Sequence, residues 1–493
     1  MSRIFALGAA PLPQENLLRQ YAANLRTWHL LKPLLEDGHE VRLVACRLLN
    51  TYPDDAEPEI RRIDGALEYI SINGDRFHDP AVIQAFFNEG WGNEKAFDAV
   101  LGINSYMASR AAIIETDKPI WCDLNGWIMA EAQTKTYVYD DDRYLSHFWN
   151  MEHAVIQRAD VISTVSDAQA YATVGELATQ GRLGRKNFGH DFVHTIPNAI
   201  SEIQYEHSSK VIRGVKAGEK LIAGDDDFVV LWAGGYNTWT DVDLLFEALT
   251  TAMAENPKIR FVSTGGMIEG HDEITFVRFR ERIDQSPFAD RFHFAGWVPT
   301  ADVPSYYFES DLGLNVDSAN YETTFGARNR LNEMMKVGLA MLTTVGTEIS
   351  RQVASDGIGL SAPLGDAAAF AERIIWASRN PKELAEMAAA AQRYGQEHFS
   401  YGRTTEPLRN WAKNPQRAPD LGEAISFRED IDFNAAQDGV VETADSVDAL
   451  AEAEARNEAL NAELASIHSS KMWALWMKYL AVRRLLLGPF GRS

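Results

Sequence analysis

The sequence predicts an α/β protein with two doubly wound domains that face a cleft, followed by a helical tail. Three observations support this fold class. Short apolar segments alternate with amphipathic segments over residues 1–200, the alternation restarts after a polar stretch at 201–227, and residues 446–493 change to helical spacing. Strands that alternate with helices build parallel sheets, because two parallel strands need a crossover connection between them.

The first domain, residues 1–200, is predicted to open with a βαβ unit. Ile4–Gly8 is an apolar strand, Gly8–Pro13 is a loop, and apolar residues then recur at helical spacing up to Gly38. The segment Gly38–Cys46 (GHEVRLVAC) returns as a second strand. Further strands are expected at 99–103, 119–122, 161–165 and 193–196.

The second domain, residues 201–413, is predicted to repeat this arrangement. Phe228–Gly235 (FVVLWAGG) is a strand that runs into a glycine turn. The segments 259–266 and 291–298 have the same form. Helices are expected at 244–253, 367–379 and 381–399, so the second domain also reads as a parallel sheet covered by helices.

A charged corner lies between two apolar strands of the second domain, at 312–316 and 340–345. It contains Glu322, Arg328 and Arg330, and the helix that carries Glu333 ends at Gly338. Open α/β sheets bind ligands outside the carboxyl ends of their strands. Guanidinium suits a diphosphate because it is always charged and bonds phosphate oxygens in pairs. The corner is therefore expected to bind a diphosphate; a surface ion-pair network on an ordinary helix is the alternative.

Composition limits the partners and the compartment. The chain has 493 residues and a net charge of −23, which argues against nonspecific binding to nucleic acid. Cys46 and Cys122 are the only cysteines and lie in strand-like segments, where buried free thiols are expected. The N-terminal segment does not resemble a signal peptide, and no apolar run reaches the length of a membrane span. The chain is expected to be cytoplasmic.

The C-terminal region is predicted to combine an acidic linker at 414–445 with a tail at 446–493. The tail begins with a short heptad stripe, which is marginal for a homodimer by itself. Residues 470–493 are basic and aromatic and contain no acidic residue. Such a segment is expected to lie on an anionic membrane, peripheral to the inner face of the plasma membrane. Docking on the protein's own surface or on a second copy of the chain is the alternative.

Four segments carry a resemblance to a known family. They are GHEV at 38–41, ADVISTVSDAQ at 159–169, VHTIPNAI at 193–200 and FAGWVP at 294–299. In order and spacing the chain resembles the retaining glycosyltransferases of family 4, whose GT-B fold has two Rossmann-like domains, over residues 1–410. The resemblance implies metal-independent transfer of a hexose from a nucleotide-diphosphate sugar to a glycan or lipid-linked acceptor, in cell-surface polysaccharide biosynthesis. The nucleotide sugar is then a substrate, and no cofactor is implied.

Two departures from the family pattern affect the site. The family has two glutamates seven residues apart; Glu333 matches the second, but Phe325 occupies the place of the first. The family lysine after the first glycine turn is also missing, because that segment reads NTWTDVD at 237–243. A subgroup with ETxFxxRxR and a tryptophan near the glycine turn is more similar, here from Glu322 to Arg330 with Trp239. This similarity implies that an arginine replaces the lysine.

The resemblance assigns roles to the charged corner. Arg328 is expected to contact the diphosphate and stabilise the leaving group, since cations can do so without a metal. Arg330, two positions later, would diverge from it on a helix and is expected to be structural. Glu322 is placed near the sugar. Glu333 is expected to accept hydrogen bonds from the ribose hydroxyls.

Further site residues are expected after other strands. Asp123 follows a buried strand and is placed as a catalytic or sugar-binding residue, with a strand-end Asx turn as the alternative. Gly234, Gly235 and Gly265 are interpreted as turns that let the backbone approach the donor. Ordinary strand-end turns are the alternative for these glycines.

Two other functions share this fold. A noncatalytic GT-B-like scaffold would explain the missing lysine and the shifted glutamate. A nucleotide-sugar epimerase would need neither an acceptor loop nor a membrane tail. A dinucleotide dehydrogenase is disfavoured, because no G-x-G-x-x-G follows the first strand.

Overall fold

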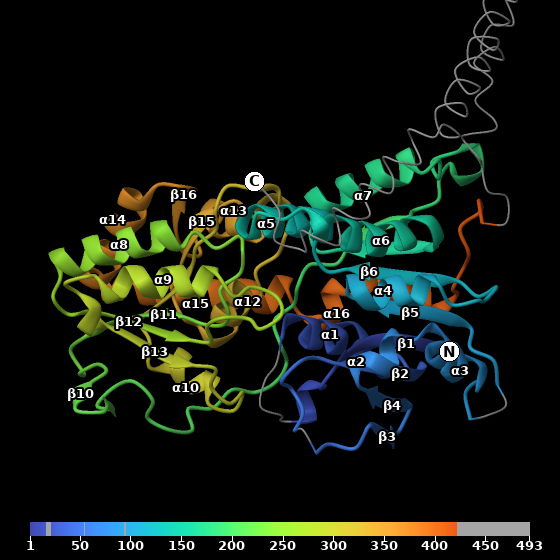
Figure 1. Ribbon diagram of the computed structural model, residues 1–493, viewed down its shortest axis with the longest axis horizontal. Helices are drawn as coiled ribbons and strands as arrows, with labels where there is room; N and C mark the ends of the chain where they lie inside the picture. The colour runs from blue at the N-terminus through green and yellow to red at the C-terminus, as the bar shows by residue number, and fades with distance from the viewer. Residues whose placement is uncertain (16–20, 54, 93–94, 422–493) are drawn as a thin grey trace, which may run out of the picture. The chain divides into compact units, whose positions relative to one another are not determined.

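The computed structural model describes residues 1–15, 21–53, 55–92 and 95–421 (Figure 1). These residues form two successive α/β halves with one large sheet each. The change from one sheet to the other falls between residues 195 and 228. The predicted fold class is confirmed for this part of the chain.

The first sheet has eight strands in the order β3-β4-β2-β1-β5-β6-β7-β8. All neighbouring strands are parallel except β3 and β4, which pair antiparallel. The β3–β4 pair at the sheet edge was not predicted. The strands are β1 (Arg3–Ala10), β2 (Glu40–Arg47), β3 (Glu59–Asp64), β4 (Leu67–Ile72), β5 (Ala99–Ile103), β6 (Ile120–Leu124), β7 (Val161–Thr164) and β8 (Val193–Thr195).

Helices cover both faces of the first sheet. Successive residues of β1 enter different cores: Phe5 and Leu7 belong to one, Ile4 and Ala6 to the other. Both faces are therefore buried, as expected for parallel strands that read as continuous apolar runs. The helices of this half are α1 (Ala22–Glu36), α2 (Gly74–His78), α3 (Pro80–Asn88), α4 (Ser105–Ala112), α5 (Ile128–Tyr139), α6 (Arg143–Arg158) and α7 (Asp167–Thr179).

The second sheet has six parallel strands in the order β13-β12-β11-β14-β15-β16. The strands are β11 (Phe228–Trp232), β12 (Ile259–Thr264), β13 (Phe292–Gly296), β14 (Leu312–Asn315), β15 (Met341–Val345) and β16 (Leu360–Pro363). A small separate hairpin, β9 (Lys216–Ala217) and β10 (Lys220–Leu221), precedes them. From β11 the chain first builds outward on one side and then, with β14, on the other. The boundary between β11 and β14 is thus a topological switch point.

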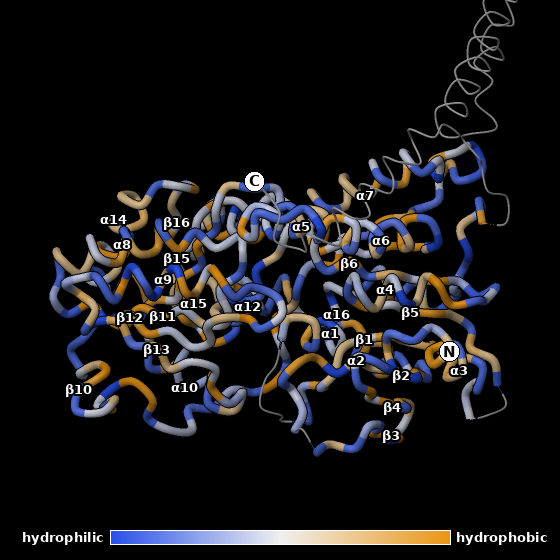
Figure 2. The backbone as a smooth tube through the Cα atoms, in the orientation of Figure 1, coloured by the Kyte–Doolittle hydropathy of each residue, from blue (hydrophilic) through white to orange (hydrophobic). Residues whose placement is uncertain are grey.

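The helices of the second half also lie on both faces of its sheet. Val230 and Trp232 of β11 enter one core, and Val229 and Leu231 enter the other. Figure 2 shows apolar stretches along these strands, and all four side chains are fully buried. The helices are α8 (Val242–Glu255), α9 (Thr275–Asp284), α10 (Val303–Phe308), α11 (Tyr321–Phe325), α12 (Asn329–Val337), α13 (Glu348–Ser355), α14 (Ala367–Arg379) and α15 (Pro381–His398).

Two final helices, α16 (Tyr401–Thr404) and α17 (Glu406–Lys413), return to the first half. Arg409 pairs with Asp37 at the end of α1, at 2.5 Å, and Ser2 Oγ donates to the carbonyl of Ala412 at 2.6 Å. The segment after the second sheet thus packs against the first one. This packing ties the two ends of the described chain to the same half.

The sequence also made predictions about the cysteines and the C-terminal tail. Cys46 and Cys122 are buried free thiols, as predicted. Within the described ranges, no helix combines the length and apolarity that crossing a membrane requires. The heptad stripe, the basic segment 470–493 and all but the first residues of the acidic linker lie outside the described residues.

Candidate functional site

Two glycine turns lie next to the switch point of the second sheet. Gly234 follows β11 with φ +98°, and Gly265 follows β12 with φ +81°, both in the region that favours glycine. A Cβ atom on Gly265 would lie 2.4 Å from the carbonyl oxygen of Gly234, and one on Gly235 would lie 2.5 Å from Ile268 Cδ1. These glycines are therefore required by the packing of the two turns against each other, whatever ligand they meet.

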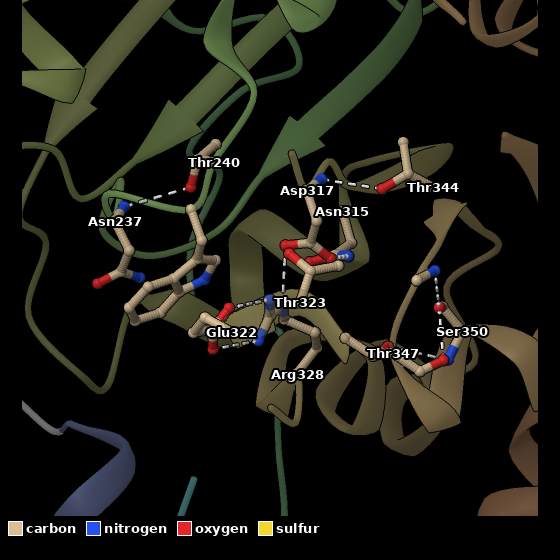
Figure 3. A network of polar contacts seen from close by, with 12 residues as sticks. Asn237, Thr240, Asn315, Asp317, Glu322, Thr323, Arg328, Thr344, Thr347 and Ser350 are labelled. Carbon is tan, nitrogen blue, oxygen red and sulfur yellow. Dashed lines mark hydrogen bonds and ion pairs between the residues drawn. The ribbon is translucent and has the colours of Figure 1, made fainter. Parts of the chain in front are cut away.

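Arg328 lies between two carboxylates (Figure 3). Its Nε donates to Asp317 Oδ1 at 2.8 Å, and Nη1 and Nη2 donate to the two oxygens of Glu322 at 2.9 and 2.6 Å. Nη1 also donates to its neighbour's carbonyl, that of Ala327, at 3.1 Å. The side chain is 6% exposed, and the guanidinium lies 5.4 Å from the ring centroid of Trp239. The charge of Arg328 is thus compensated from within the protein.

The same network shifts the ionisation of its members. Burial raises the pKa of Glu322 to about 7, although Arg328 works to lower it. Burial works to lower the pKa of Arg328, but the charges of Asp317 and Glu322 outweigh it and raise that pKa. Asp317 follows β14, and its backbone N–H donates to Thr344 Oγ1 at 2.8 Å. The network holds the loop after β14 in place.

Arg330 has a different environment two residues later. Its Nε donates to the carbonyl of Ala233 at 3.1 Å and its Nη2 to the carbonyl of Gly235 at 3.2 Å. The guanidinium carbon lies 3.6 Å from the ring centroid of Trp232. Arg330 forms no ion pair with a carboxylate among the residues that the structure describes. Burial lowers its pKa to about 10, against the opposing pull of Asp317, so it stays charged near neutral pH.

Glu333 lies one turn along α12 and is half-buried. The hydroxyl of Tyr205 donates to its Oε2 at 2.6 Å. Lys336 stands over the Tyr205 ring, with Nζ 3.2 Å from the centroid. Burial lowers the pKa of Lys336 to about 8, while Glu333 works to raise it. Tyr205 thus occupies one oxygen of the carboxylate that the sequence assigns to ribose.

Asp123, at the end of β6, is fully buried and fully paired. Arg26 of α1 donates to both of its oxygens, at 2.6 and 3.0 Å, and Ser163 Oγ donates to Oδ1 at 2.6 Å. Arg26 also reaches the carbonyl of Pro197 at 3.3 Å and Asn198 Oδ1 at 3.4 Å. The pair connects the first sheet to the segment that closes it. These contacts account for the position of Asp123 without the strand-end Asx turn that was the alternative.

The charged corner of the second half contacts the first half directly. Ser166 Oγ, which caps α7, donates to the carbonyl of Phe325 at 2.8 Å, and the Trp127 and Phe325 rings meet edge to face at 4.9 Å. Asn332 Nδ2 donates to the carbonyl of Asn198 at 2.9 Å. The corner therefore lies where the two halves meet.

Three partners of the site residues were missed from the sequence. Asp317 pairs with Arg328, Tyr205 with Glu333 and Arg26 with Asp123. Asp317 could have been found, because it directly follows an apolar strand in the same corner. Tyr205 and Arg26 lie 128 and 97 residues from their partners. No local pattern marks them.

The two α/β halves together have the GT-B fold. Residues 227–380 match the family described as "Glycosyl transferases group 1". Membership in family 4 rests on the sequence resemblance alone. None of the curated proteins compared with the sequence matches it.

Solved structures with this fold align with 84% of the chain. Sucrose-phosphate synthase from Thermosynechococcus elongatus is 14% identical, with a TM-score of 0.60 over 98% of its chain. Anabaena HepE, solved in complex with UDP and glucose, is 15% identical, with a TM-score of 0.56 over 100% of its chain. The trehalose-6-phosphate synthase OtsA is 10% identical, with a TM-score of 0.57 over 100% of its chain. At these identities the likeness establishes the fold.

Proposed function

We propose that the chain is a retaining, metal-independent hexosyltransferase that uses a nucleotide-diphosphate sugar and a glycan or lipid-linked acceptor. The observation that carries this proposal is the environment of Arg330. A half-buried cation stands beside a glycine turn at a switch point, and its hydrogen-bond partners are backbone carbonyls. A desolvated cation without a carboxylate favours an anion from outside the chain. The donor diphosphate is such an anion.

In this proposal Arg330, not Arg328, contacts the diphosphate. Arg328 has its donors directed to Asp317 and Glu322, so a phosphate would have to displace a buried ion pair. Arg330 retains N–H groups beyond the two that bind carbonyls. It also lies in the first turn of α12, and Arg328, the N-cap residue of this helix, makes no side-chain capping bond. The amides of that turn add to the attraction for an anion.

The remaining site residues then have supporting roles. Glu322 and Arg328 hold the loop after β14, and Asp123 holds α1 against the first sheet; each positions the site through another residue. Glu333 binds the ribose hydroxyls with the oxygen that Tyr205 leaves open. Gly234, Gly235 and Gly265 let the backbone pass close to the donor.

The reaction breaks the bond between the anomeric carbon and the phosphate oxygen and forms one to an acceptor oxygen. The electron pair of the broken bond stays on the leaving diphosphate, where Arg330 and the α12 amides stabilise the growing charge. The acceptor hydroxyl loses its proton to the departing phosphate on the same face of the sugar. Configuration is thereby retained, and no protein nucleophile is needed.

The wider setting is proposed on the sequence alone. Residues 470–493 would hold the protein on an anionic membrane, where lipid-linked acceptors of cell-surface polysaccharide synthesis are exposed. The heptad stripe would add a contact with a second copy of the chain. Both segments lie outside the described residues.

Calorimetric binding of UDP, GDP, dTDP, CDP and ADP tests the proposal. UDP is titrated first, because HepE was solved with it. One nucleotide is expected to bind the wild type and to be lost or strongly weakened in Arg330→Ala and Glu333→Ala. If none binds, the noncatalytic scaffold becomes the better explanation. Isomerisation of a donor sugar without any acceptor would instead identify an epimerase.

A further inference from the structure

A cavity of about 770 Å³ lies between the last strand of the first sheet and the two final helices. We call it the β8–α17 groove, after two of the elements that line it. His194 and Thr195 come from β8, and Glu406, Asn410 and Trp411 come from α17. Its volume falls within the range of roughly 300–1,000 Å³ typical of sites for small organic ligands.

The groove is separate from the proposed donor site. Val161, which lines it, is the first residue of β7, so this part of the groove lies toward the amino ends of the strands. The charged corner lies beyond the carboxyl end of β14 in the other sheet. None of the residues assigned to the donor site lines the groove.

One side chain in the groove lacks a polar partner. Arg403 is exposed and forms neither an ion pair nor a side-chain hydrogen bond with any residue in the described ranges. Its guanidinium carries five N–H donors, so the groove has hydrogen bonds to offer.

Aromatic packing holds this wall in place. Two rings pack on Trp121. The Trp411 ring meets it edge to face at 5.4 Å, and the His194 ring stacks on it at 5.4 Å with an interplanar angle of 10°. Trp121 is fully buried and its Nε1 donates to Ser163 Oγ at 2.9 Å. This wall of the groove is thus preorganised, which lowers the entropic cost of binding a ligand.

The charges in the groove favour a neutral ligand. Arg403 shares the lining with two carboxylates, Asp191 and Glu406. Burial lowers the pKa of His194, with Asp191 working in the opposite direction, so that its imidazole is neutral at pH 7 and above. Amides from Asn410, Asn414 and Gln416 add donors and acceptors, and Lys413 Nζ donates to Asn410 Oδ1 at 2.9 Å. An anion would meet two carboxylates here, whereas a hydroxyl group can both donate and accept.

We propose that the β8–α17 groove binds a neutral oligosaccharide through Arg403 and the amide side chains. A sugar hydroxyl both donates and accepts, which matches a wall of mixed donors and acceptors. Binding itself does not require the transferase function. The additional assignment of the bound chain as a remote part of the acceptor rests on that proposed function.

Ligand-observed NMR on the full-length protein, with saturating UDP present, tests the groove. The probes are maltotriose, cellotriose, mannotriose, galactotriose and chitotriose, with inorganic phosphate as the anionic probe. At least one trisaccharide is expected to bind. Arg403→Ala and Asn410→Ala are expected to weaken it about tenfold each, the size of one lost hydrogen bond to a charged or rigid group.

The variants are chosen to separate binding from folding. Arg403 and Asn410 are exposed, so shortening either side chain leaves no buried cavity. Arg417→Ala, exposed and outside the groove lining, is the matched control and is expected to bind like the wild type. Absence of binding by all five trisaccharides, binding of phosphate alone, or equal binding by the groove variants would overturn the proposal. Nucleotide binding in the groove variants should stay unchanged, so failure here is distinct from failure of the donor site.

Discussion

The guanidinium of Arg330 stacks on the ring of Trp232, with its carbon 3.6 Å from the ring centroid, while its hydrogen bonds go to backbone carbonyls. Arg328, two residues earlier, is enclosed by Asp317 and Glu322. The two arginines of the corner thus differ in the one property that matters for an anion. One charge is compensated within the protein and the other is not.

Arg330→Ala should abolish or greatly weaken nucleotide binding while changing the free energy of unfolding little. Arg328→Ala should do the reverse and cost about 3–5 kcal/mol of stability, because it leaves two buried carboxylates without their cation. Calorimetry with the bound nucleotide and urea unfolding measure the two effects. If a folded Arg328→Ala protein lost more nucleotide binding than Arg330→Ala, Arg328 would be the residue that contacts the diphosphate.

The Arg26–Asp123 pair should behave as a structural element. Asp123→Ala leaves the guanidinium of Arg26 buried, and is expected to lower the free energy of unfolding by about 3–5 kcal/mol. The double variant Arg26→Met/Asp123→Leu removes both charges and should recover much of this loss. Chemical unfolding of the two variants and the wild type measures the recovery. A folded, stable Asp123→Ala protein without transfer activity would instead support a catalytic Asp123.

Glu152 and Glu176 should make stability depend on pH. Burial, followed by the charge of Glu176, raises the pKa of Glu152 well above its usual range, and the Glu152 side chain is buried. Trp127 Nε1 donates to Glu176 at 2.9 Å, so the acid pair adjoins the contact between the halves. The folded state therefore binds more protons than the unfolded one. The stability contributed by protonated Glu152 is present below the pKa of about 4.3 that a glutamate has in the unfolded chain. It is lost as pH rises through the pKa of Glu152 in the folded state.

Glu152→Gln tests this linkage, because the amide is neutral at every pH. Its gain in melting temperature over the wild type is expected to grow between pH 5 and pH 8, as measured by differential scanning calorimetry. Glu219→Gln, at an exposed position, is the control and should show a small, constant difference. A gain that does not change with pH would show that Glu152 keeps its ordinary ionisation.

Gly265→Ala should be more damaging than an alanine at another left-handed glycine. The new methyl group would meet the Gly234 carbonyl oxygen at 2.4 Å in addition to the strain of φ +81°. Gly357 has φ +65° and open space around it, so Gly357→Ala should cost only about 1 kcal/mol. Thermal unfolding compares the two variants. Equal losses would mean that the two glycine turns do not pack as closely as the structure shows.

Deleting residues 471–493 should reduce sedimentation with vesicles that contain anionic lipid. Nucleotide binding should remain, because the donor site lies within the described residues. The expected loss follows from removing a basic, aromatic segment from a chain of net charge −23. Unchanged vesicle binding would show that the segment is not a membrane anchor and would favour its docking on protein.

Periodicity in the sequence was enough to predict most of the architecture. Alternating apolar and amphipathic segments predicted β1, β2, β5–β8, β11–β15 and helices such as α14, whose bounds 367–379 match the structure. Of the unpredicted β3–β4 pair, β3 lies at the sheet edge and is largely exposed, so it has no apolar pattern to recognise. β4 is buried throughout and was missed although LEYISI contains apolar residues.

The sequence by itself determined the fold class, the join near residue 200 and the charged corner at 322–333, because these depend on the order and spacing of neighbouring residues. Only the tertiary structure decided which arginine is already paired. It also placed Asp123 with Arg26, and brought α17 from the end of the described chain back to β8. Local spacing cannot show these relationships, because an ionic group's partner is chosen by proximity in space. A carboxylate 97 residues away can neutralise a charge as completely as one 6 residues away.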